Sequence, residues 1–212
     1  MSLPRRAFLT LPAIAAAAGC SPIDLVGGSR PPPRLYELTP KSTFPPDLPQ
    51  VKGVVRVESA TATAGLNTTR IALRPSPTAL EYYANALWID VLPVMVQNLF
   101  VESLENSGAI DAVGPAAAGV PARFGLLLHI REFQAEYSAP AVPPTARVRL
   151  QCRAVTLPRR DSVAATGAES AVEATGTALD AVVDAFDEAL GKAMREIVVW
   201  AAQTLHAEET RR

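Results

Sequence analysis

The chain has 212 residues, of which 49% are hydrophobic and 19% are charged, and its formal net charge at pH 7 is −1. This length and apolar content suit one globular domain with a core of its own. The balanced charge argues against a nucleic-acid-binding protein, which would need a clustered excess of basic residues. We therefore expect a single folded domain with no nucleic-acid partner.

Residues 1–19 have the features of a lipoprotein signal peptide. Two basic residues, Arg5 and Arg6, precede an apolar run from Phe8 to Ala18. That run is much shorter than the roughly 20 residues that a membrane-spanning helix needs, so it is typical of a secretory signal. Small residues then lead to Cys20, whose thiol would receive the diacylglycerol. We predict cleavage before Cys20 and lipidation of its thiol; the alternative is a buried cysteine behind an ordinary signal.

The same signal resembles a twin-arginine export signal. Arg5 and Arg6 are followed by Phe8 and Leu9 in the order that this signal uses, although Thr10 replaces its usual lysine. The alternative is export by the general secretory route, in which the two arginines serve only as the basic region. Both routes deliver the protein to the cell envelope.

Residues 20–33 are rich in glycine and proline and show no periodicity, which predicts a lipidated, flexible tether. Fully extended, a tether of this length would reach on the order of 45 Å. Residues 34–207 are predicted to form the folded domain. The other cysteine of the chain is Cys152, and because Cys20 would be acylated we expect no intrachain disulfide.

The first half of the domain reads as several strands followed by one helix. Strand-like segments are found at 35–38, 54–58, 70–74 and 79–83, with a hairpin turn between the last two. Apolar residues at helical spacing then predict a helix from Leu92 to Ser107, in which Pro93 is tolerable because it lies in the first turn. Gly108 is the expected end of that helix.

The second half reads as four strands followed by a long helix. The strands are predicted at 110–113, 124–137, 147–157 and 163–174. Apolar residues at helical spacing predict a helix from Thr177, as its N-cap, to about Leu205. We therefore predict an α+β domain of two layers, in which two main helices pack on a mostly antiparallel sheet.

No arrangement typical of catalysis or cofactor binding appears in the sequence. It contains no nucleotide-binding glycine loop, no nucleophile elbow, and no spacing of metal ligands. His129 and Cys152 could meet on neighbouring strands as a catalytic pair, although such residues are more often a half-exposed strand histidine and a small buried thiol. We therefore expect a protein that is not an enzyme and that needs no cofactor and no metal.

Three arginines line one face of the strand predicted at 147–157. They are Arg147, Arg149 and Arg153, at alternating positions. They could contact anionic lipid headgroups or an acidic partner. The simpler interpretation, which we favour, is a solvated face paired with Glu132 or Glu136 on a neighbouring strand.

One block resembles a known family. It contains Tyr82-Tyr83, Trp88 and Pro93 at the entrance of the first helix, and Gly108 at its end. Together with the cleavage site at Cys20, this block resembles the ABC-type transport auxiliary lipoprotein family, the PqiC-like proteins. The resemblance also includes Tyr36-Glu37-Leu38, Arg70-Ile71-Ala72-Leu73-Arg74, His129-Ile130-Arg131-Glu132-Phe133, Ala185-Phe186-Asp187 and Trp200.

The resemblance implies a non-catalytic envelope component of a lipid-transport system. In such systems an inner-membrane ABC permease and ATPase work with an MCE-domain protein that bridges the periplasm. The lipoprotein is then expected to dock to the MCE-domain protein at the outer membrane, and a homo-oligomeric ring is compatible with this role. Ser21, in place of the aspartate that retains lipoproteins in the inner membrane, favours the same location, facing the periplasm. The alternative is a structural lipoprotein that supports assembly of an outer-membrane complex without handling lipid.

Overall fold

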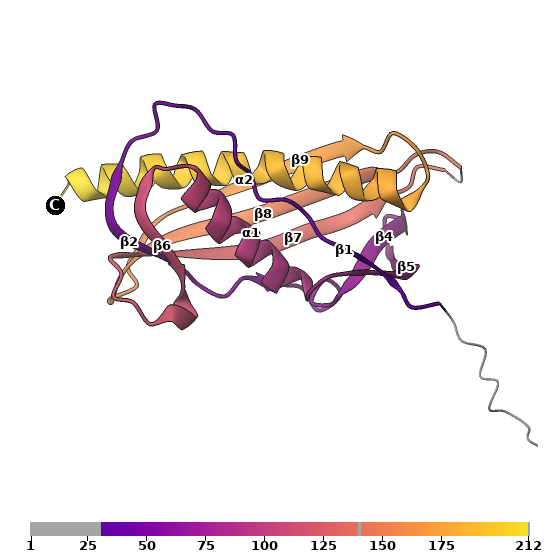
Figure 1. Ribbon diagram of the computed structural model, residues 1–212, viewed down its shortest axis with the longest axis horizontal. Coiled ribbons are helices and arrows are strands. Elements are labelled where there is room, and N and C mark those ends of the chain that lie inside the picture. The colour runs from indigo at the N-terminus through magenta and orange to yellow at the C-terminus, as the bar shows by residue number, and fades with distance from the viewer. Residues whose placement is uncertain (1–30, 140, 212) are drawn as a thin grey trace, which may run out of the picture. The chain divides into compact units, whose positions relative to one another are not determined.

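The computed structural model describes residues 31–139 and 141–211. The predicted sites at Arg5, Arg6 and Cys20 lie outside these residues. Pro32–Arg212 form one compact unit, in which α1 (Leu92–Asn106) and α2 (Leu179–Thr210) cover one face of a nine-stranded sheet (Figure 1). Within the described ranges, no helix is both long and apolar enough to span a membrane.

The sheet is organised around β7, the longest strand, which lies centrally as its apolar first half predicts. On one side β7 pairs with β8, and on the other side it pairs in turn with β2, β3 and β4. The strands are β1 (Arg34–Tyr36), β2 (Val51–Val57), β3 (Thr61–Ala62), β4 (Arg70–Ser76), β5 (Ala79–Trp88), β6 (Ile110–Pro115), β7 (Phe124–Glu136), β8 (Thr145–Thr156) and β9 (Ser162–Glu173).

The predicted α+β class with two helices on a sheet is confirmed, and the sheet is mixed, not purely antiparallel. The hairpins β4–β5, β7–β8 and β8–β9 are antiparallel. In contrast, β2, β3 and β4 run parallel to β7, β6 runs parallel to β2, and β1 runs parallel to β5. The parallel pairs of β6 and β7 with β2, β3 and β4 join strands before and after α1, which provides the long crossover that parallel pairing needs; β1 and β5 are connected through β2, β3 and β4.

The core lies between the sheet and the helices, and three aromatic rings stand at its centre. Phe133 of β7 and Phe186 of α2 stack with ring centroids 5.1 Å apart. Trp88, at the end of β5, meets both rings edge to face, at 5.9 Å and 5.6 Å. All three side chains are fully buried. Each such ring pair adds about 0.5–1.5 kcal/mol beyond the burial of its surface.

The first helix confirms its prediction at both ends. Pro93 lies in the first turn of α1, where the missing N–H costs no helical hydrogen bond. Gly108 follows the helix with φ of 62°, a left-handed conformation in which glycine meets no steric penalty. The buried face of α1 includes Met95, Val96 and Phe100, as the helical spacing predicts.

The start of α2 differs from the prediction. Ala178, and not Thr177, is the N-cap residue, and no side chain caps the helix. The first turn is instead held by Asp180, whose carboxylate accepts a hydrogen bond of 2.7 Å from the Tyr36 hydroxyl and forms an ion pair of 2.8 Å with Arg34. A tertiary contact to β1 therefore holds the first turn, without capping its backbone N–H groups.

The end of α2 also differs, because the helix continues past Leu205 to Thr210. Glu209, in the last turn, forms an ion pair of 2.8 Å with Arg123 and accepts a hydrogen bond of 3.1 Å from the backbone N–H of Lys52. These contacts join the last turn to β2 and to the start of β7, so the helix does not end where its apolar stripe ends.

Candidate functional site

The candidate site is the face of the sheet opposite the helices, called here the open face. It carries the outward side chains of β7, β8 and β9, and none of the described helices covers it (Figure 1). Along β8 the alternation is as predicted, with Val148, Leu150 and Cys152 buried toward the helices and the intervening residues outward. The outward residues of β8 are Arg147, Arg149, Gln151 and Arg153.

One half of the open face is an ion-pair network, as the simpler interpretation of the arginines predicted. Arg147 donates a hydrogen bond of 2.9 Å from Nε to Glu136 and also pairs with Glu169 of β9. Arg149 pairs with Glu132. Glu136 in addition faces Arg74 of β4 at 3.5 Å. Every arginine in this half therefore has a carboxylate partner from a neighbouring strand.

The network sets the ionisation of Glu136. Partial burial tends to raise the pKa of its carboxyl, but hydrogen bonds from Arg147 and Gln134 and the positive charges of Arg147 and Arg74 outweigh burial, so the pKa is lowered. The same pairing raises the pKa of the Arg147 guanidinium, chiefly through its hydrogen bond to Glu136. Both groups are therefore charged at neutral pH, and the network carries little net charge.

The other half of the open face differs, and here the pairing interpretation is wrong for Arg153. Within the described chain, no carboxylate lies within ion-pair distance of Arg153. Arg131 donates from Nε and Nη2 to the side-chain oxygen of Gln151, at 3.1 Å and 2.5 Å, and likewise has no carboxylate partner there. With Thr61 and His129, these side chains line a recess of about 250 Å³.

The neighbouring strands β7 and β9 explain the difference between the two halves. The strand β7 supplies Glu132 and Glu136 to one half only. Opposite Arg149, β9 bears Glu169, but opposite Gln151 and Arg153 it bears Gly167 and Ala165. Residues directly opposite on antiparallel strands share a face and lie within contact distance. The fold thus provides an internal carboxylate for one half of the face and only small residues for the other.

The structure separates His129 and Cys152. Cys152 lies opposite Leu128 and points into the core, whereas His129 lies opposite Gln151 on the open face, with Nδ1 2.9 Å from the Thr61 hydroxyl. Neighbouring residues of a strand point to opposite faces, so the two side chains cannot meet. Burial raises the pKa of the Cys152 thiol to about 12, which keeps it protonated and unreactive. The described residues also contain no cluster of side chains that could hold a metal ion.

The tyrosine-rich block that carries the family resemblance is part of the framework. The Tyr82 hydroxyl donates to the backbone oxygen of Gly65 at 2.9 Å, and the hydroxyls of Tyr83 and Tyr137 lie 2.7 Å apart. Trp88 stands in the aromatic core. The guanidinium of Arg70 lies over the Tyr82 ring, 3.8 Å from its centroid. This block therefore fixes β5 against its neighbours and offers no reactive group.

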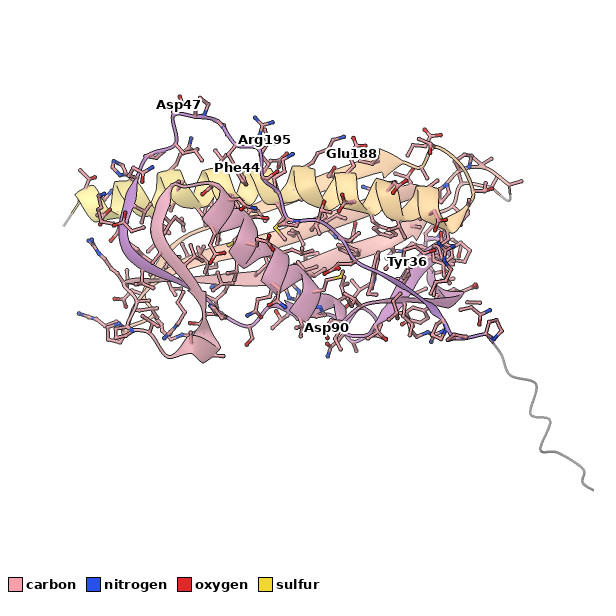
Figure 2. All side chains as sticks on the ribbon, in the orientation of Figure 1. Tyr36, Phe44, Asp47, Asp90, Glu188 and Arg195 are labelled. Atoms are coloured by element: carbon pink, nitrogen blue, oxygen red, sulfur yellow. The ribbon has the colours of Figure 1, made fainter. Side chains whose placement is uncertain are left out.

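A second surface lies on the helical side, where residues 37–50 cross α2. The backbone N–H and the hydroxyl of Thr39 donate to the Asp187 carboxylate at 2.6 Å and 2.7 Å. Figure 2 shows Phe44 and Arg195 on this side of α2. An open recess of about 510 Å³ is lined there by Arg195 and Trp200, among others. It mixes both charge signs with apolar side chains and contains no reactive arrangement.

Comparison with known proteins identifies the family of this chain. The model of a family described as the ABC-type transport auxiliary lipoprotein component matches residues 36–198. The chain belongs to this family. The match includes the aromatic core, both halves of the open face and most of α2. Membership shows an auxiliary lipoprotein of ABC-type transport, and this role fits a protein without a catalytic site of its own.

Individual relatives agree with this assignment. A solved protein of Xanthomonas campestris is 27% identical, with a TM-score of 0.77 over 84% of this chain and 99% of that one. A second solved protein, 11% identical with a TM-score of 0.58 over 84% of this chain and 99% of its own, shows the fold alone. A curated protein of Bradyrhizobium diazoefficiens is 26% identical over an alignment of 182 residues that covers 83% of this chain and 47% of the relative. The chain thus spans about half the length of that curated relative.

Sequence reasoning found the arginines of the open face but missed the residues that complete its unpaired half. Thr61 lies on β3, a strand of two residues whose parallel pairing with β7 has no local signal. Ala165 and Gly167 matter only through their register with β8. The strand β9 is rich in alanine, but the sequence alone does not show that Ala165 lies opposite Arg153.

Proposed function

We propose that this protein is a non-catalytic, lipid-anchored component of an ABC/MCE-type system that moves lipid between membranes. In this role it docks to the periplasm-spanning MCE-domain protein at the outer membrane. The observation that carries the proposal is the family match over residues 36–198, which makes the chain an auxiliary lipoprotein of ABC-type transport. The inner-membrane permease and the ATPase are separate chains.

The proposed layout assigns a task to each part of the chain. Residues 1–19 are removed, Cys20 carries the lipid, residues 20–33 form the tether, and residues 34–207 dock to the partner. A lipoprotein carries two or three acyl chains, and each buried CH₂ adds about 0.8 kcal/mol, so attachment is effectively permanent. The tether then limits how far from the membrane the domain meets its partner.

Co-purification tests the proposal. A tagged full-length chain, expressed at its native level and cross-linked in cells, is expected to retain the MCE-domain protein and the ABC permease. Loss of the gene is expected to make the envelope sensitive to detergents. Capture of an outer-membrane assembly complex without any ABC transporter would instead favour the structural lipoprotein, and would contradict the transport role.

A further inference from the structure

The unpaired half of the open face is the strongest candidate for a further site. We propose that Arg153 and Arg131 form a docking surface for an acidic segment of a partner protein. This inference deepens the proposed function, on which it rests, because it names the chemistry of the partner segment. Arginine is well suited to the task, since its planar guanidinium binds carboxylates through paired hydrogen bonds.

The two halves of the face provide an internal comparison. Where β7 and β9 bear Glu132, Glu136 and Glu169, each facing arginine is neutralised within the chain. On the same strands a few residues away, no described carboxylate neutralises Arg153 or Arg131. Glu58, which directly follows β2, is already paired with Arg56 at 2.9 Å and lies 3.9 Å from Arg160. The region around Arg153 therefore carries an excess of positive charge.

The surroundings of Arg153 leave room for a ligand. Ala165 on β9 and Leu127 on β7 flank it, and both lack a polar group. Gln151 holds the Arg131 guanidinium through two hydrogen bonds, and this contact fixes its position beside the recess. The recess, about 250 Å³ in volume, is also lined by Ser59 and Thr61. Two positive charges beside an open, partly polar recess fit carboxylate side chains that approach from outside.

The basic surface and the point where the chain enters the domain lie toward different ends of β7. The tether joins the domain at β1, which pairs with β5; the next strand, β4, meets β7 at Ala135, near its end (Figure 1). Arg153 lies opposite Leu127, near the start of β7. Eight residues of strand separate Leu127 from Ala135, or about 25 Å. Arg153 therefore lies near the opposite end of β7 from the Ala135 pairing, and its binding chemistry, a guanidinium without an internal carboxylate, is what favours an acidic protein segment.

Two variants test the surface with the full mature chain in detergent micelles. Arg153→Glu reverses the charge. Ala165→Glu keeps Arg153 but gives it an internal carboxylate, as Glu169 does for Arg147. Arg195→Glu, on the exposed side of α2, is the matched control for charge. The probe is a labelled polyglutamate peptide, with a polyglutamine peptide of equal length as its control, and binding is followed by fluorescence anisotropy.

The proposal predicts that the wild-type chain binds polyglutamate and that salt weakens this binding. Both open-face variants should lower the affinity by about tenfold or more, while Arg195→Glu should change it by less than about twofold. Equal binding of polyglutamine, or equal loss in all three variants, would overturn the proposal. So would displacement of the peptide by phosphatidylglycerol in mixed micelles, because the surface would then be a lipid-headgroup site.

Failure of this inference is distinct from failure of the proposed function. If the variants leave peptide binding unchanged while the MCE-domain protein still co-purifies, only the assignment of this surface is wrong. If polyglutamate binds as predicted but no ABC transporter co-purifies, the assignment of Arg153 and Arg131 as a docking surface is supported and the transport role is contradicted.

Discussion

Trp88 and Phe186 meet edge to face in the centre of the core, with ring centroids 5.6 Å apart. The contact joins the end of β5 to the first third of α2, two elements that lie far apart in the chain. It explains why the tryptophan of the tyrosine-rich block and the Ala185-Phe186-Asp187 segment both belong to the family resemblance: they build one aromatic core.

Phe186→Ala is expected to lower the free energy of unfolding by about 3–5 kcal/mol, because it removes two ring contacts and leaves a cavity under α2. Phe44→Ala, at a partly buried position in the segment that crosses α2, is the control and should cost clearly less. Denaturant unfolding of both variants measures the difference. Equal losses of unfolding free energy in the two variants would show that the three aromatic rings contribute no more to stability than a partly buried side chain.

The ion-pair network predicts a pH dependence. The pKa of Glu136 is lowered from its usual 4.5, so its ionised form stabilises the folded protein above that pH. This contribution should disappear as the pH falls through the lowered pKa. In Glu136→Gln the free energy of unfolding should depend less on pH in the acidic range, whereas Glu81→Gln, at an exposed position of β5, should show the wild-type dependence. Denaturant unfolding at a series of pH values measures both. An equal pH dependence in Glu136→Gln and the wild type would contradict the role of the network.

Cys152 is predicted to be chemically silent in the folded protein. Its thiol is buried and its pKa is raised to about 12, so alkylating reagents should modify it only after unfolding. Cys152→Ala should retain full function in a complementation assay. Rapid labelling of the native protein, or loss of function in Cys152→Ala, would contradict this role as a small core residue.

How far the sequence could predict these features depends on how local their causes are. Gly108 and the apolar stripe of α1 are local signals, and the structure confirms them. Thr177 is not the N-cap: the helix begins after Ala178, and its first turn is tied to the distant Tyr36 through Asp180, a contact that has no local signal. The parallel pairing of β2, β3 and β4 with β7 depends on crossovers that leave no periodic pattern.

At the candidate site, too, the sequence predicts local features but not contacts between strands. The alternation along β8 predicted which arginines point outward, since a strand has a period of two. Whether each arginine is neutralised depends on its neighbours across the sheet. Arg147 reaches Glu136 of β7 and Glu169 of β9, whereas Arg153 faces Leu127 and Ala165, and this contrast follows from the register of β8 with both of its neighbours. Sequence periodicity contains no information on that register.

The anchor is tested separately. Cys20→Ser should leave unprocessed precursor, because the signal peptidase for lipoproteins acts only after the thiol has been acylated.

Combined Arg5→Lys and Arg6→Lys should trap precursor in the cytoplasm if export uses the twin-arginine route. Immunoblots of cell fractions detect the precursor and the mature protein in both experiments. The wild-type protein is expected in the outer-membrane fraction. Normal maturation of the double arginine variant would assign export to the general secretory route.

The most direct test of the account is site-specific photocross-linking in living cells. A photoreactive residue is placed at Gln151 on the open face and, in a second strain, at Glu188 on the exposed side of α2, and the cross-linked proteins are identified by mass spectrometry. The account predicts a covalent adduct with the MCE-domain protein of an ABC transport system, and the inference on the open face predicts it from Gln151. Adducts from both positions that contain only outer-membrane assembly proteins, with no component of an ABC transporter, would contradict the proposed function.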